Sequence, residues 1–166
     1  MNQGTQLITI LGTGKYEETT YTFQEKEKHT RYVSLALIEF FQPSSVTVLL
    51  TEDARNAHWQ KLNETAHDAL QDVPPFYDLP IPSGSTEAEM WQLFDAVVSA
   101  VEPGARVIFD ITHSFRSIPM FVLLASIFIQ KAKNASIEGL YYGAYNPKET
   151  HAPIFDLTPA LKLLDW

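Results

Sequence analysis

The segment VIFDITHSFRSIPMFVLLASIF, residues 107–128, decides the fold of this chain. It starts with β-branched and aromatic residues typical of a buried strand, and residues 118–129 form an apolar run long enough for a helix. We expect the helix to span residues 115–133. The turn between strand and helix is too polar for a buried crossing. A strand that passes through such a turn into a helix is the repeating unit of α/β proteins.

The rest of the chain repeats this alternation. Expected strands cover residues 6–11, 45–51, 76–81, 107–112 and 136–145, with a further one at 152–158. Expected helices cover residues 32–41, 52–70, 83–101 and 115–133, with a short closing turn at 159–164. A small β-hairpin, residues 19–23 and 27–31, follows the first strand. The pattern predicts a Rossmann-like α/β fold, with a mostly parallel sheet flanked by helices.

Composition narrows the class of protein. With 166 residues, 45% hydrophobic and 19% charged, the chain suits one globular domain. Its net charge of −8 argues against binding long nucleic acid, where phosphate contacts carry most of the affinity. It has no cysteine, which excludes disulfides and thiolate catalysis. The N-terminus is unlike a signal peptide, and residues 118–129 are too short to span a membrane, so we expect a soluble cytoplasmic protein.

The first strand ends in a glycine-rich loop that could hold an anion. Gly12, Thr13, Gly14 and Lys15 combine backbone amides that can approach a ligand with a hydroxyl and a positive charge. The third glycine position of the dinucleotide fingerprint holds Glu17, and the P-loop spacing is missing. A tight turn without a ligand explains the loop about as well.

The turn within the opening segment is the second candidate. Thr112 or Ser114 can cap the helix expected to begin at residue 115 or 116, and Asp110 can orient the turn. A helix N-terminus favours an anion, and His113 and Arg116 add donors. Capping does not explain these two donors. Since parallel strands end at one edge of the sheet, we expect both candidate segments to lie together.

Other chemistries have little support in the sequence. Asp110, His113 and Ser114 are too close in sequence for a hydrolase triad, and the G-x-S-x-G motif is missing. The histidines lack metal-ligand spacing, and His58 and His67 are expected to be solvated on their helix. We therefore expect neither a metal nor a cofactor.

Two further segments remain open. Three tyrosines and Asn146, within residues 141–147, could stack on a base and hydrogen-bond to it. Core packing and ordinary turn chemistry explain them almost as well. The pair Thr150 and His151 is equally undecided.

The helix expected after the polar turn is apolar on nearly every side. Such a helix is buried all round, either under the sheet or at a subunit interface. A twofold dimer packed through residues 118–129 would bring two copies of the turn at residues 112–116 near one axis. Its ligand would then be large, anionic and roughly twofold symmetric.

Five quoted stretches carry a resemblance to a known family. LGTGKYEETTYTF, VTVLLTEDA, IPSGSTEAEMWQLFDAVVSAV, VIFDITHSFRSIPM and DLTPALKLLDW resemble, in order, a CARF domain, the CRISPR-associated Rossmann fold. The subgroup motif is D-x-T-H-G-F-R-x-x-P, and Ser114 replaces its glycine. This departure leaves open whether ligand size or hydrogen bonding changes. The resemblance implies a homodimeric sensor of cyclic oligoadenylate, most commonly cyclic tetra-adenylate, in type III CRISPR antiviral defence.

The resemblance also implies site residues and partners. The expected ligand-binding residues come from both segments and the tyrosine-rich stretch: Gly12, Thr13, Gly14, Lys15, Thr112, His113, Ser114, Phe115, Arg116 and Asn146. Family members usually carry an effector, fused or separate. We expect a sensor domain over residues 1–166 without one, because the R-x-x-x-x-H ribonuclease motif is missing.

Two alternatives to a plain sensor stay open. One is a ring nuclease that cleaves the ligand without metal by attack of a ribose 2′-hydroxyl. Its catalytic residues would be Thr13, Lys15, His113 and Arg116. Outside the family, the alternative is a generic nucleotide-binding domain in which Glu52 or Asp53 binds the ribose.

Overall fold

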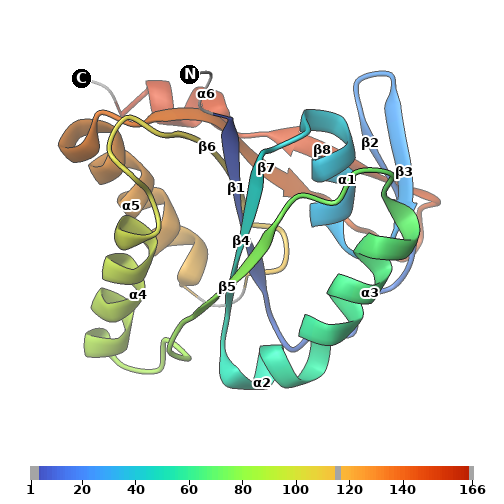
Figure 1. Ribbon diagram of the computed structural model, residues 1–166, viewed down its shortest axis with the longest axis horizontal. Coiled ribbons are helices and arrows are strands. Elements are labelled where there is room, and N and C mark those ends of the chain that lie inside the picture. Colours follow the sequence, from blue (N-terminus) through green and yellow to red (C-terminus); the bar gives the residue numbers. More distant parts are fainter. Residues whose placement is uncertain (1–3, 115–116, 165–166) are drawn as a thin grey trace.

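The computed structural model describes residues 4–114 and 117–164, and its centre is an eight-stranded sheet (Figure 1). The strand order is β3-β2-β8-β7-β6-β1-β4-β5. The strands are β1 (Thr5–Leu11), β2 (Thr19–Phe23), β3 (Lys26–Thr30), β4 (Ser45–Leu50), β5 (Phe76–Pro80), β6 (Arg106–Asp110), β7 (Ser136–Gly143) and β8 (His151–Asp156). Neighbouring strands from β7 to β5 pair in parallel, which confirms the expected mostly parallel α/β sheet.

Helices cover both faces of this sheet (Figure 1). One core packs α1 (Val33–Phe41) and a long helix made of α2 (Glu52–Ala54), the π-helical turn η1 (Arg55–Trp59) and α3 (Gln60–Ala69). A second core packs α4 (Glu87–Ser99), α5 (Ile118–Lys133) and the short α6 (Thr158–Lys162). Strands such as β1 supply side chains to both cores in alternation, because successive residues of a strand point to opposite faces.

The expected hairpin after the first strand is present and has an unexpected partner. β2 and β3 pair antiparallel, and β2 then pairs in parallel with β8, so that Thr20 lies beside His151. Since β8 is itself antiparallel to β7, the hairpin extends the sheet rather than standing apart from it. The loop after β1 is thereby held at both of its ends by the sheet.

The start of α5 was predicted wrongly. The helix begins at Ile118, with Pro119 in its first turn, rather than at residue 115 or 116. Neither Thr112 nor Ser114 caps it, because the Thr112 hydroxyl bonds to Asp110 and the Ser114 hydroxyl donates to the Ile111 carbonyl. A proline in the first turn costs no hydrogen bond, so it marks a helix start.

The expectation that this helix is buried on all sides is also wrong for the protomer. Ile118, Val122, Ala125 and Ile129 face the core, whereas Met120 is 63% exposed. Leu124 and Phe128 follow at intervals of four, each 46% exposed. Trp91 on α4 is also exposed and packs edge-to-face on Phe121. Phe94 packs edge-to-face on both Trp91 and Phe128. Together these side chains form the α4–α5 face, consisting of Trp91, Phe94, Met120, Phe121, Leu124 and Phe128.

In the described part of the chain, no helix has the length and apolarity that a bilayer crossing requires.

Candidate functional site at the carboxyl edge of the sheet

The ends of β1 and β6 are joined by a buried carboxylate. Asp110 is 1% exposed and accepts three hydrogen bonds, from the Thr9 hydroxyl (2.6 Å), the Thr112 amide (2.9 Å) and the Thr112 hydroxyl (2.6 Å). The Thr112 hydroxyl also accepts from the Gly143 amide at the end of β7 (2.8 Å). Burial raises the pKa of Asp110, and the three donors oppose that rise. Asp110 therefore orients the turn after β6, as expected from the sequence.

The loop after β1 is folded around an aromatic residue that sequence reasoning missed. The Gly12 amide, expected to face an anion, donates to the Tyr16 hydroxyl (2.8 Å). Thr13, Gly14 and Lys15 are exposed, and the Lys15 ammonium lies 3.8 Å from a Glu17 carboxylate oxygen. The charge expected at this loop thus lies in solvent at the carboxyl edge, beside the Glu17 carboxylate.

The two candidate segments meet through a stack of three rings. Tyr16 stacks on His113, with centroids 3.9 Å apart, and on His58 at 4.6 Å; both pairs are inclined by 29°. Tyr16 belongs to the loop after β1, His113 to the turn after β6, and His58 to the π-helical turn. Burial raises the pKa of Tyr16 to about 12, so its ring is a neutral phenol at physiological pH.

His113 is held in its uncharged form. Burial, with a smaller effect of His58, lowers the pKa of His113 from 6.5 to about 3. The Val33 amide at the start of α1 approaches the His113 Nε2 atom at 3.5 Å, so that nitrogen is the acceptor and Nδ1 carries the proton. In this arrangement Nε2 has no proton to give to a leaving group at neutral pH.

A cavity of about 240 Å³ lies beside this stack. Its lining joins the loop after β1, the turn after β6, the hairpin and the end of β7: Lys15, Tyr16, Glu17, Tyr21, Arg31, Thr112, His113, Tyr142, Gly143 and Tyr145. Two cations and two exposed tyrosines give it the chemistry to hold a phosphate and a planar base. The loop after β1 and the turn after β6 therefore lie together at one edge of the sheet, as expected.

The remaining predicted residues lie in different places. Ser114 is half-buried in the turn after β6, and Phe115 and Arg116 lie outside the described residues. Asn146 is exposed beyond the cavity lining, and its side chain accepts from the Lys148 amide (3.0 Å). Tyr141 belongs to the core, where it stacks on Phe41 at 4.8 Å.

Sequence reasoning missed Tyr16, Arg31 and His58, and it was wrong that His58 is solvated. His67 is exposed, as expected. The position of Tyr16 directly after Lys15 was an available signal, because a ring in a glycine-rich loop has few places to pack. No local sequence pattern indicates Arg31, which follows the β2–β3 hairpin and lines the cavity because the hairpin folds back beside the loop. Glu52 and Asp53, the generic ribose candidates, lie exposed at the start of α2 and do not line the cavity.

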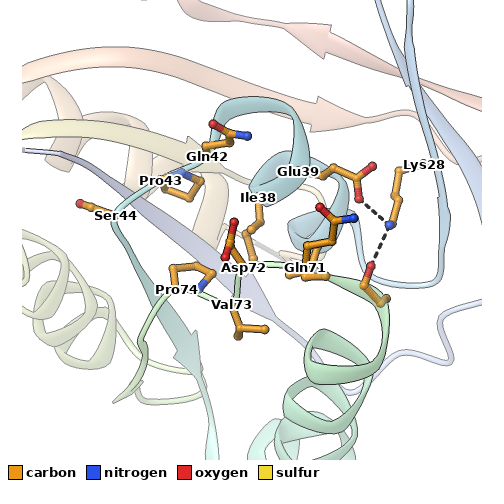
Figure 2. Close-up of a pocket in the computed structure, with 12 residues that line it drawn as sticks. Lys28, Ile38, Glu39, Gln42, Pro43, Ser44, Gln71, Asp72, Val73 and Pro74 are labelled. Carbon is orange, nitrogen blue, oxygen red and sulfur yellow. Dashed lines mark hydrogen bonds and ion pairs between the residues drawn. The ribbon is translucent and has the colours of Figure 1, made fainter.

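A larger cavity of about 650 Å³ lies at the opposite edge, before β4 and β5 (Figure 2). Its cation is already paired, because the Lys28 ammonium forms an ion pair with Glu39 and donates to the Ala69 carbonyl (3.0 Å). Within the described residues, no group of three or more metal-ligating side chains is present. The cavity at the carboxyl edge is therefore the candidate site.

Comparison with known proteins gives one informative match. No protein-family model matches the chain. Over 91 residues it is 36% identical to CRISPR-associated protein MJ1674 of Methanocaldococcus jannaschii. The matched region covers 52% of this chain and 14% of that protein, so the chain spans a small part of its relative's length. The chain is thus a distant homologue of a CRISPR-associated protein.

Proposed function

We propose that this chain is a sensor domain for cyclic oligoadenylate, most commonly cyclic tetra-adenylate, that acts as a homodimer in type III CRISPR defence. The observation that carries the proposal is the contact between Tyr16 and His113. It joins the loop after β1 to the turn after β6 beside a cavity with the charges of Lys15 and Arg31. These two segments are the ones that bind the ring in the family this sequence resembles.

The chemistry of the cavity suits a nucleotide. Lys15 and Arg31 can pair with phosphate, and the exposed rings of Tyr142 and Tyr145 offer faces for adenine. The Thr13 hydroxyl in the exposed loop adds a donor. The volume of about 240 Å³ lies below the usual range for small-molecule sites, roughly 300–1,000 Å³, so one protomer encloses only part of a large ring.

The α4–α5 face supports a second copy of this chain as the missing half. Its exposed residues, Met120, Leu124 and Phe128, run along α5 from its first turn, which directly follows the candidate turn. An apolar stripe of this kind is unusual on the free surface of a monomer. Packing two copies through it places both turns near a twofold axis, where one symmetric ring contacts both protomers.

The role in CRISPR defence rests on the similarity to MJ1674 and on the motif of residues 110–119. The relative's greater length fits an architecture in which a sensor acts on an effector. We therefore include a fused or separate effector in the proposal.

Sensing is favoured over ring cleavage. A nuclease role would use His113 to protonate the leaving 5′-oxygen. At neutral pH, which is well above its pKa of about 3, His113 is uncharged, and its Nε2 atom faces the Val33 amide. Thr13, Lys15 and Arg116 would then have to stabilise the transition state without an imidazolium as general acid.

Calorimetric titration with cyclic tetra-adenylate, cyclic hexa-adenylate and NAD tests the proposal. We expect sub-micromolar binding of one cyclic oligoadenylate at one ring per two chains, and at least about tenfold weaker binding by Arg116→Ala. Binding of NAD alone, or of none of the three, would overturn it. Incubation of excess ring without metal, followed by chromatography, should return intact ring, whereas linear products would restore the nuclease alternative.

A further inference from the structure

His58 connects the candidate ligand loop to the helix layer of the protein. It lies on η1, the π-helical turn between α2 and α3, and its side chain is half-buried. Its Nε2 atom lies 2.7 Å from the Gly14 carbonyl oxygen, and its Nδ1 atom lies 3.0 Å from the Tyr32 hydroxyl. His58 does not line the cavity, so it reaches the ligand only through other groups.

The two partners determine the tautomer of His58. A backbone carbonyl can only accept a hydrogen bond, so Nε2 carries the proton and donates to Gly14. In the neutral ring Nδ1 is then the acceptor, and the Tyr32 hydroxyl donates to it. Tyr32 is fully buried at the start of α1, so it is a fixed anchor for the imidazole.

The same imidazole also supports the ring stack. Tyr16 lies between His58 and His113, and the Tyr16 hydroxyl accepts from the Gly12 amide. His58 therefore fixes the loop twice, directly at Gly14 and through Tyr16 at Gly12. A β-carbon at Gly14 would approach the Tyr16 ring to 3.2 Å, which shows how closely the loop wraps this ring.

The π-helical turn explains why His58 faces the loop. Ala54 and Leu62 are buried and lie four residues before and after His58. In an α-helix, a side chain four residues further along is rotated by about 40° round the helix axis, so residues at this spacing move off one face. The wider π turn reduces this rotation. The turn thus keeps His58 on the face that packs against the sheet and the loop. Single π turns occur frequently at functional sites.

We propose that His58 is a positioning residue that holds the loop of Gly12, Thr13, Gly14 and Lys15 in its ligand-binding shape. The proposal rests on the proposed function, in which this loop contacts the cyclic oligoadenylate. It assigns the residue a role through the Gly14 carbonyl and the Tyr16 ring, without contact to the ligand.

Two amide substitutions separate the contacts of His58. In His58→Gln the side-chain NH₂ can occupy the place of Nε2 and donate to Gly14, while in His58→Asn the shorter side chain reaches only Tyr32. His67→Asn, on the exposed side of the same helix, is the matched control. Losing the donor to Gly14 removes a hydrogen bond that holds the loop, an effect large enough to change an affinity by up to about tenfold.

Measurements with and without ligand test the proposal. By NMR hydrogen exchange on the free protein, we expect the Gly12 amide to exchange at least about tenfold faster in His58→Asn and at nearly the wild-type rate in His58→Gln and His67→Asn. Cyclic tetra-adenylate should bind about tenfold more weakly to His58→Asn, with affinity restored in His58→Gln.

Each outcome decides a separate question. Equal Gly12 exchange in the two His58 variants would overturn the positioning role, as would equal affinities for the ring. If the wild-type protein binds no ring, the proposed function fails, while the exchange rates still decide whether His58 holds the loop.

Discussion

The Thr9 hydroxyl on β1 donates to the buried Asp110 carboxylate on β6 at 2.6 Å. The two residues are direct neighbours in the parallel pairing of these strands. Each lies just before one of the segments that meet at the candidate site. The bond therefore fixes the relative position of the two segments before any ligand arrives.

Asp110→Asn should change the pH dependence of stability. Burial raises the pKa of Asp110 above its ordinary value of 3.8, so the folded protein binds this proton more tightly than the unfolded chain. Its contribution to the free energy of unfolding then falls as pH rises from 3.8 through the folded pKa. We expect Asp110→Asn to gain stability relative to the wild type as pH rises above 3.8, measured by urea unfolding at a series of pH values. Asp156→Asn, in a similar Asp-x-Thr turn, is the control for the loss of one negative charge. A stability difference between Asp110→Asn and the wild type that does not change with pH would contradict the prediction.

Acid should destabilise the protein through His113. Its pKa falls from 6.5 in the unfolded chain to about 3, so the unfolded state binds this proton first as pH falls. The stability that the neutral ring contributes is complete above pH 6.5 and decreases towards pH 3. Between pH 7.5 and pH 5 the wild type should lose about 2 kcal/mol more than His113→Gln. Urea unfolding at both values measures this, and parallel losses in the two proteins would show that His113 titrates normally.

Lys15→Ala should weaken ligand binding without affecting the fold. The Lys15 side chain is 91% exposed, and an exposed ion pair such as that with Glu17 contributes little to stability. We expect an unchanged melting temperature, an affinity for cyclic tetra-adenylate lower by about tenfold, and a smaller dependence of that affinity on salt. Lys61→Ala, exposed on α3, is the control and should match the wild type. Equal affinity in both variants would remove Lys15 from the site.

Leu124→Asp should break the proposed dimer. The substitution places a carboxylate in the middle of the exposed stripe of α5, where it would be buried without a partner in the dimer. Sedimentation velocity should show a more than about tenfold weaker self-association for this variant. Tyr77→Asp, at another exposed large hydrophobic position on β5, serves as the control. If both variants sediment like the wild type, the dimer does not form through the α4–α5 face.

The sequence predicted the fold class because its signals are local. Strand and helix differ in period and length, and those differences are clear in nearly every segment of this chain. The start of α5 was missed because polar turn residues were treated as caps, although Pro119 in the first turn marked it better. Periodicity identified Leu124 as apolar but cannot say whether another element covers it.

Part of the candidate site could be predicted from the sequence, for a related reason. Lys15 and His113 stand at strand ends, and the rule for parallel sheets brings strand ends together. His58 and Arg31 reach the same place from a helix and a hairpin, through contacts between residues far apart in sequence. A lone histidine on a polar stretch of helix looks solvated, and no local pattern reveals the π turn that directs it inward.

The pairing of β2 with β8 has a consequence for biosynthesis. Thr20 finds its strand neighbour, His151, only after all the residues between them have been made, and closing so long a loop is entropically costly. Until β8 leaves the ribosome, the hairpin has no sheet to join and the loop after β1 has no second anchor. The candidate site should accordingly be among the last parts of this sheet to become ordered.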